Sequence, residues 1–240
     1  MLPGMIIHQK KVSGLTGKVF NNGLYLNRPM DLSIKYKAEC REVARFMKRL
    51  YGHGLTTTSG GNISLRLKGG KIAITPSATD KGRMQWKEVG ILAMSGKNLT
   101  PHLKPSIETE MHLSIYRRTN AQAIVHAHPV FATTFTAMDR EINTSLIAES
   151  VAILGKPTFV PYALMGTREL ADMVAENIGK SDILLLENHG VLSIGASLLQ
   201  AFDKIEVLEN AARMTVITEI MGSIKSLSGK RIDEIEKFFR

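Results

Sequence analysis

The chain has 240 residues, of which 44% are hydrophobic and 22% charged, so it can bury the core of one large domain. A single cysteine excludes an internal disulfide, and no run of about 18 uncharged apolar residues predicts a transmembrane helix. The net charge of +9 is concentrated in the first 37 residues, where six basic residues stand against one aspartate. Because no basic run is interleaved with aromatic residues, we do not expect binding to nucleic acid. The single cysteine and the lack of a long apolar run lead us to expect a cytoplasmic protein that binds no membrane.

The first half of the chain predicts an irregular start, a helix and a hairpin. Residues 1–34 hold scattered glycines and are expected to form an N-terminal extension. Apolar residues recur near every 3.6 positions over 35–51, which predicts an amphipathic helix that ends at the following glycines. Residues 62–75 alternate on both sides of a Gly-Gly pair, as in a β-hairpin. Ser106 is then expected to cap the next helix.

The second half alternates strands with helices. Pro129 suits the first turn of a helix that follows the first of these strands. The strands are predicted at 121–128, 157–161, 182–188 and 191–195, and the further helices at 166–179, about 197–221 and 229–239. Since several strand pairs are linked as hairpins, we expect a layered α/β architecture with an at least partly antiparallel sheet.

Three histidines are candidate metal ligands. His126 and His128 lie two positions apart in an apolar strand, so both imidazoles should point to one face. His189 follows another buried strand, and Gly190 would allow close approach to its contacts. Three neutral imidazoles with an open fourth position are typical of catalytic zinc. By itself, however, the pattern is equally compatible with hydrogen-bonded core and turn histidines.

Glu108 and three loops are candidates for the rest of a site. Glu108 begins the helix before the histidine strand. It is either a metal ligand and general base, or a carboxylate that the helix dipole stabilises at the helix start. The stretches "SGGN" at 59–62 and "TPSAT" at 75–79, together with the helix start at Ser106, offer backbone N–H groups and hydroxyls to an anion.

Six motifs together resemble one family. They are "SGGNIS", "ITPSATD", "KPSIETEMHLSIY", "IVHAHPVFAT", "VPYALMGTREL" and "LLLENHGVLSIG". In this order and spacing they resemble the class II aldolase/adducin family, and within it the L-fuculose-1-phosphate aldolases, over residues 35–220. The resemblance implies a three-layer α/β/α fold around a mostly antiparallel sheet. It also implies a homotetramer with active sites between subunits.

The resemblance assigns the candidate site residues. It implies that His126, His128, His189 and Glu108 bind one zinc ion per subunit, or another divalent metal, and that Glu108 is also the catalytic acid and base. The substrate phosphate is implied to bind at Gly61, Asn62, Ser77, Ala78, Ser106 and Ile107. The implied domain covers 35–221, and the C-terminal segment 222–240 is expected at a subunit interface.

Three departures from the family pattern bear on the site. The fuculose enzymes often have Thr-Gly where this chain has Ser77-Ala78, and Ser-Ser at 106–107, so one hydroxyl donor is missing and a backbone N–H must replace it. Asn188 replaces a histidine, which is ordinary variation. The family's catalytic tyrosine has no match in residues 143–155, which leaves Glu149 or a neighbouring subunit to protonate the aldehyde.

The implied reaction is the reversible cleavage of a ketose 1-phosphate, of the L-fuculose 1-phosphate type, into dihydroxyacetone phosphate and an aldehyde such as lactaldehyde. It would proceed through a metal-stabilised enediolate, with burial expected to raise the pKa of Glu108. An L-ribulose-5-phosphate 4-epimerase is one alternative, although the expected aspartate near 140–148 is absent and only Glu141 is there. A methylthioribulose 1-phosphate dehydratase and a non-catalytic adducin-like module are the others.

Overall fold

The structure is a computed structural model that describes residues 32–239. Residues 1–31, and with them almost all of the expected N-terminal extension, lie outside the described part, as does residue 240. No helix among the described residues combines the length and apolar character needed to cross a bilayer.

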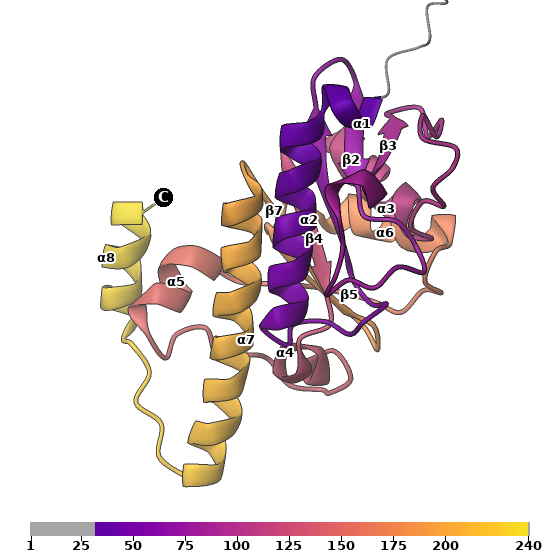
Figure 1. Ribbon diagram of the computed structural model, residues 1–240. Coiled ribbons are helices and arrows are strands. Elements are labelled where there is room, and N and C mark those ends of the chain that lie inside the picture. Colours follow the sequence, from indigo (N-terminus) through magenta and orange to yellow (C-terminus); the bar gives the residue numbers. More distant parts are fainter. Residues whose placement is uncertain (1–31, 240) are drawn as a thin grey trace, which may run out of the picture. The chain divides into compact units, whose positions relative to one another are not determined.

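One seven-stranded sheet forms the centre of the fold, in the order β3-β2-β1-β4-β7-β6-β5 (Figure 1). Every neighbouring pair is antiparallel except β5 and β6, which confirms the expected mostly antiparallel sheet. The predicted hairpin is β1 and β2, paired from Ser64↔Ile74 to Leu67↔Lys71. The strands are β1 Asn62–Leu67, β2 Lys71–Ile74, β3 Gly90–Ala93, β4 Ala123–Ala127, β5 Thr158–Val160, β6 Ile183–Leu186 and β7 Gly190–Gly195.

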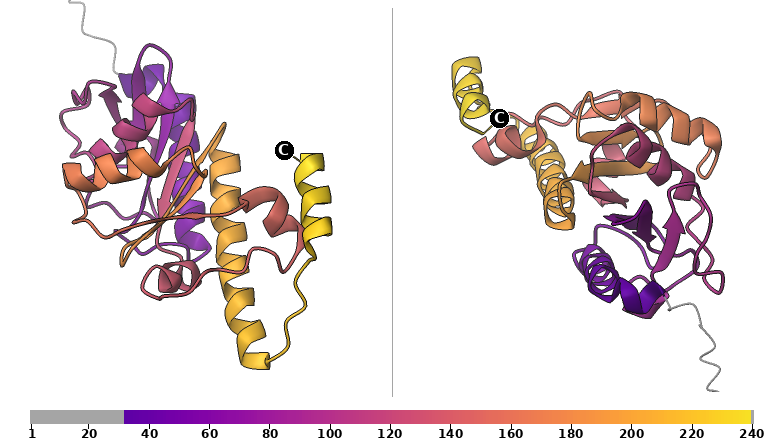
Figure 2. Two further views of the ribbon diagram at one scale, coloured as in Figure 1. Left: turned by 180° about the vertical axis from the view of Figure 1, so that it is seen from behind. Right: turned by 90° about the horizontal axis from the view of Figure 1, so that it is seen from above.

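Helices cover both faces of this sheet, which confirms the three-layer α/β/α architecture (Figures 1 and 2). One hydrophobic core lies beneath α2, α4 and α7, and a second lies beneath α3 and α6. The helices are α1 Leu32–Lys35, α2 Lys37–Gly52, α3 Thr109–Arg118, α4 Val130–Phe135, α5 Ala148–Leu154, α6 Arg168–Asn177, α7 Leu198–Met221 and α8 Gly229–Phe239, with a short 3₁₀ turn at Trp86–Glu88.

Strand β4 shows how alternation divides the two cores. Ala123, Val125 and Ala127 point toward α2 and α7, whereas Ile124 belongs to the core beneath α3 and α6. His126 shares the parity of Ile124 and therefore lies on the α3 face of the sheet. Because the strand is buried on both faces, its sequence is a continuous apolar run broken only by this histidine.

Two helix starts differ from the sequence prediction. Ser106 does not cap α3; Glu108 occupies the N-cap position, and the Ser106 hydroxyl accepts the Glu108 N–H at 3.3 Å. Residues 107–108 form a turn before the helix, and the Glu108 side chain makes no capping hydrogen bond. Pro129 stands one position before the first turn of α4, with extended backbone, at the N-cap.

Candidate active site

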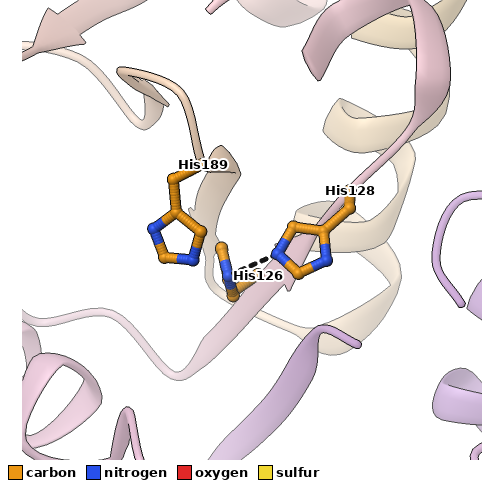
Figure 3. Close-up of side chains that lie close together, drawn as sticks. All are labelled: His126, His128 and His189. Carbon is orange, nitrogen blue, oxygen red and sulfur yellow. Dashed lines mark hydrogen bonds between the residues drawn. The ribbon is translucent and has the colours of Figure 1, made fainter. Parts of the chain in front are cut away.

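The three histidines predicted from the sequence converge at one point (Figure 3). His126 comes from β4, His128 from the first position beyond that strand, and His189 from the turn between β6 and β7. One ring nitrogen of each lies within 4.8 Å of the others, and the Nε2 atoms of His126 and His128 are 3.1 Å apart. The antiparallel pairing of β4 with β7 brings residues more than 60 positions apart to this point.

The orientation of His126 leaves one nitrogen free to bind a metal. Its Nδ1 lies 3.0 Å from the backbone oxygen of Val191, an acceptor, so Nδ1 carries the proton and donates it. The lone pair is then on Nε2, which faces His128 and Glu108. A hydrogen bond of this kind to a backbone carbonyl is the usual support of a metal-binding histidine.

Glu108 completes the cluster. The side chain is buried, with Oε2 3.3 Å from His126 Nε2 and Oε1 3.2 Å from His189 Nε2. Oε1 of Glu108 and Nδ1 of His189 are buried and make no hydrogen bond within the described structure. Three imidazole nitrogens and one carboxylate, whose Oε1 makes no hydrogen bond, form a donor set that fits a divalent metal ion.

Burial and mutual contact set the protonation of the cluster. Burial lowers the pKa of His126, and lowers that of His128 to about 3, so both are neutral, the form that binds metals. For Glu108 burial raises the pKa, but the positive charge that His126 carries when protonated, together with the contacts to His189 and the Asn62 amide, outweighs burial and holds the pKa below its usual value. The expected raised pKa of Glu108 is therefore wrong, and a lowered pKa keeps the carboxylate ionised at neutral pH.

Two glycines are required by the packing around the histidines. Gly61 has φ +61°, and a Cβ there would lie 2.8 Å from the His126 backbone oxygen. A Cβ on Gly190 would lie 2.4 Å from Cδ2 of His128. The sequence predicted a close approach at Gly190, and the structure shows that the neighbour is the His128 ring.

The predicted phosphate loops also meet. The Ser77 N–H donates to the Lys104 oxygen at 3.0 Å and its hydroxyl to the Pro105 oxygen at 2.9 Å, so residues 76–77 run beside 104–105. Ala78 has φ +55°, the left-handed conformation for which glycine is favoured. Ser106 is buried, whereas the neighbouring Ile107 is half exposed. These loops end beside Glu108, which lies two residues after Ser106.

Asn62 behaves differently from the other predicted phosphate ligands. Its Nδ2 donates to Glu108 Oε2 at 2.6 Å and its Oδ1 contacts the buried ring of His112. The side chain is thus directed at Glu108. On this strand it shares a face with His126, its Cα partner on β4.

Comparisons with known proteins agree with this site. The family model described as "Class II Aldolase and Adducin N-terminal domain" matches residues 41–216. The chain belongs to this family. The metal dependence typical of class II aldolases is consistent with the His126, His128 and His189 group.

Relatives within the class II aldolase/adducin family carry more than one activity in their names. An L-fuculose phosphate aldolase of Methanococcus vannielii is 32% identical over 75% of this chain and 96% of its own length. A 3-oxo-tetronate 4-phosphate decarboxylase of Haemophilus influenzae is 31% identical over 70% of this chain and 81% of its own. A solved L-fuculose 1-phosphate aldolase superposes with a TM-score of 0.77 at 29% identity, covering 84% of this chain and 96% of that one. These relatives place the chain among the lyases of the class II aldolase type.

Two acidic residues considered from the sequence lie outside the histidine cluster. Glu149 is exposed on α5, and Glu141 pairs with Lys156 at 3.5 Å on the wall of a cavity of about 790 Å³ that none of the three histidines lines. Neither contacts the cluster in this single chain.

Sequence reasoning missed the residues behind Glu108. His112 and Tyr116 follow it at four-residue steps on the α3 face toward the sheet, a spacing that could have revealed them. Lys81 was also missed, because a lysine in a polar loop suggests exposure, yet it is buried and its Nζ donates to the Pro76 oxygen at 2.6 Å.

Proposed function

We propose that this protein is a zinc-dependent class II aldolase that reversibly cleaves a ketose 1-phosphate of the L-fuculose 1-phosphate type. The products would be dihydroxyacetone phosphate and an aldehyde such as lactaldehyde. The observation that carries the proposal is the buried Glu108 carboxyl group, whose oxygens lie 3.3 and 3.2 Å from two of three converging imidazoles.

Each side chain has a distinct task in this proposal. His126, His128 and His189 would hold the metal, and Glu108 would be its fourth ligand at rest. A zinc ion bound there supplies Lewis acidity that polarises the substrate carbonyl and lowers the energy of negative charge on its oxygen. The His126–Val191 hydrogen bond keeps the first ligand in its binding tautomer throughout.

Glu108 would move the proton on carbon. In the condensation direction its carboxylate takes a proton from the hydroxymethylene carbon of dihydroxyacetone phosphate. The freed electron pair forms the bond to the aldehyde carbon, and the aldehyde oxygen takes up a proton from water. In cleavage that hydroxyl gives its proton back to water as the bond breaks, the electron pair stays on the phosphate-bearing fragment, and Glu108 returns its proton to the carbon. The ionised state of Glu108 is the one that removes the proton.

The loops beside Glu108 would hold the phosphate. We propose that the backbone N–H groups at Gly61, Ala78 and Ile107, with the hydroxyls of Ser77 and Ser106, receive it. The left-handed backbone at Gly61 and Ala78 turns successive N–H groups toward one side, as in other anion-binding loops. Ile107 replaces a hydroxyl donor with its backbone N–H.

The test is hydrogen exchange into dihydroxyacetone phosphate alone, with no aldehyde. Zinc-loaded protein in deuterated water should cause stereospecific loss of one hydroxymethylene proton signal in the NMR spectrum, and a chelator should stop it. Glu108→Gln should slow the exchange by about a thousandfold, since it removes the general base. Glu110→Gln is the matched control on the same helix, because that carboxylate pairs with Arg117 at the surface.

Absence of exchange in protein that holds stoichiometric zinc would overturn the aldolase proposal. That result would favour the epimerase and dehydratase alternatives. Full exchange by Glu108→Gln would remove Glu108 from its proposed role while leaving the aldolase chemistry in place.

A decarboxylase is the second candidate, favoured by one specific observation. Residues 143–155 contain no tyrosine to protonate an aldehyde oxygen, and loss of CO₂ from a 3-oxo acid phosphate forms the same kind of carbanion without that step. The relative named 3-oxo-tetronate 4-phosphate decarboxylase is 31% identical to this chain. Release of CO₂ from such a substrate, faster than cleavage of L-fuculose 1-phosphate, would favour this candidate.

A further inference from the structure

A buried polar cluster lies between β1 and α3, behind the proposed acid-base residue. Asn62 and Ser64 are two positions apart on β1 and face the same side, and His112 and Tyr116 are four apart on α3 and face them. All four side chains are nearly or fully buried. A cluster of this size in a core requires satisfied hydrogen bonds, since an unpaired polar group that is removed from water destabilises the fold.

The cluster forms one unbranched chain of hydrogen bonds. Glu108 Oε2 lies 2.6 Å from Asn62 Nδ2, and Asn62 Oδ1 lies 2.5 Å from His112 Nε2. On the other side of the ring, His112 Nδ1 lies 2.6 Å from the Ser64 hydroxyl, which lies 2.8 Å from the Tyr116 hydroxyl. The chain thus links Glu108 to a tyrosine through three intermediate groups.

The carboxylate determines the direction of every bond in this chain. An ionised Glu108 only accepts, so Asn62 must present its NH₂ group to it and its carbonyl oxygen to His112. That oxygen also only accepts, so His112 must carry its proton on Nε2. Since His112 is buried and neutral, Nδ1 accepts from Ser64, and Ser64 in turn accepts from Tyr116. Burial, which lowers the pKa of His112 to about 3, is consistent with this neutral ring.

The far end of the chain is fixed as well. Arg66, the next residue on the same face of β1, donates from Nη2 to the Tyr116 backbone oxygen at 2.7 Å and lies 4.7 Å from the Tyr116 ring centroid. The same guanidinium also donates to the backbone oxygens of Thr119 and Ala121. The Tyr116 hydroxyl is therefore held against Ser64 by the packing of α3 on β1.

We propose that His112, supported by Ser64 and Tyr116, is a positioning residue that locks the Asn62 amide and thereby holds the Glu108 carboxylate in place. A flipped Asn62 would set its oxygen against a carboxylate and its NH₂ against the His112 N–H, two repulsive contacts. The Asn62 side chain accordingly serves the acid-base residue. This role rests on the proposed function of Glu108.

The first test reads the resting enzyme and needs no substrate. Long-range proton–nitrogen NMR correlation on protein with ¹⁵N-labelled histidines should show His112 as the neutral Nε2–H tautomer, unchanged from neutral to mildly acidic pH. Ser64→Ala removes the donor to Nδ1 but leaves the Asn62 oxygen against Nε2, so the Nε2–H tautomer should persist and only the Nδ1 signal should shift. A wild-type His112 with its proton on Nδ1 would overturn the proposal, whatever reaction the enzyme catalyses.

The second test is a kinetic comparison of two buried-serine variants. Ser64→Ala should lower kcat for hydrogen exchange by about tenfold, the effect of one lost buried hydrogen bond, with KM for dihydroxyacetone phosphate and zinc content unchanged. Ser193→Ala is the matched control, because its hydroxyl is equally buried but donates to the Ala201 oxygen on the opposite face of the sheet. It should lose stability without losing kcat.

The outcomes separate the two proposals. If wild-type protein fails to exchange, the aldolase function is overturned. The measured tautomer of His112 still shows which way the Asn62 amide is oriented. If wild-type protein exchanges and Ser64→Ala affects only stability, as Ser193→Ala does, the positioning role is overturned. Tyr116→Phe should give a smaller loss of kcat in the same direction, because its hydroxyl is one bond further from Glu108.

Discussion

Lys81 is a buried ammonium group in the loop after β2. The side chain is 1% exposed, and its hydrogen bond to the Pro76 oxygen is not accompanied by an ion pair within 4.0 Å among residues 32–239. Removal from water disfavours the charged form, and burial lowers the pKa of Lys81 from 10.5 to about 8. At a pH low enough to protonate Lys81 in both the folded and the unfolded chain, burial of this charge therefore lowers the free energy of unfolding.

This pKa shift predicts an unusual dependence of stability on pH. Between pH 8 and 10.5 the unfolded chain binds more protons at Lys81 than the folded chain does, so the free energy of unfolding should rise with pH. The rise attributable to this group is about 3 kcal/mol, and Lys81→Met should abolish it. Denaturant unfolding at several pH values measures the slope, with the exposed Lys97→Met as control. Equal slopes for wild type and Lys81→Met would contradict the prediction.

At the scale of elements, α4 depends on α7 for its N-terminus. The Glu209 carboxylate of α7 accepts the backbone N–H groups of Phe131 at 3.0 Å and Ala132 at 2.8 Å, while Pro129 in the N-cap position offers no side-chain acceptor. A helix of six residues is not stable alone. Because α4 begins two residues after His128, this contact also supports the strand end that carries His128.

Glu209→Gln should therefore destabilise the protein by about 1–2 kcal/mol, since an amide accepts less strongly than a carboxylate at a helix start. It should also weaken zinc binding, because His128 loses part of its support. Chemical denaturation and a competitive chelator titration measure the two effects. Glu206→Gln, on the same helix but paired with His53 near the surface, should change stability by less than about 0.5 kcal/mol. Similar losses in the two variants would remove the special role of Glu209.

The elements themselves were largely predictable, and their ends were not. The alternation around Gly69 and Gly70 predicted the hairpin correctly, and the 3.6-residue period predicted α2 and α7. Helix α5 was missed, because seven residues are too few for a clear period. The start of α3 was misplaced because Ser106 has the chemistry of a cap, whereas residues 107–108 form a turn and the helix begins at Thr109.

At the scale of the whole molecule, apolar side chains near the C-terminus have no cover in this single chain. Helix α8 packs on α5, and the segment before it is tied by the Leu227 N–H to the Ser145 oxygen at 2.9 Å. Large exposed apolar side chains lie at the end of α7 and on and before α8: Ile217, Ile220, Met221, Ile224, Phe238 and Phe239. We propose that segment 222–240 lies at an interface of a homotetramer. In this proposal residues 35–221 form the catalytic domain.

Deletion of residues 222–240 tests this arrangement. The shortened chain should run at a lower molar mass in light scattering, because it loses apolar contact area between subunits. It should still bind zinc, since the proposed ligands lie at the N-cap of α3, at the end of β4 and in the β6–β7 turn. Phe238→Ser with Phe239→Ser is the milder variant that leaves the backbone intact. An unchanged tetramer after deletion would contradict the interface, and a monomeric wild type would contradict the tetramer.

The sequence by itself determined most of the elements, the family and the shared face of His126 and His128, because periodicity and motif spacing are local properties. Only the tertiary structure decided which side chains contact one another and which are buried. It brought His189 and Glu108 to His126, directed Asn62 toward Glu108 through His112, and buried Lys81. It also reversed the expected direction of the Glu108 pKa. Burial and electrostatic contact depend on strand pairings and helix packing between distant residues, and these are not visible in any local stretch of the chain.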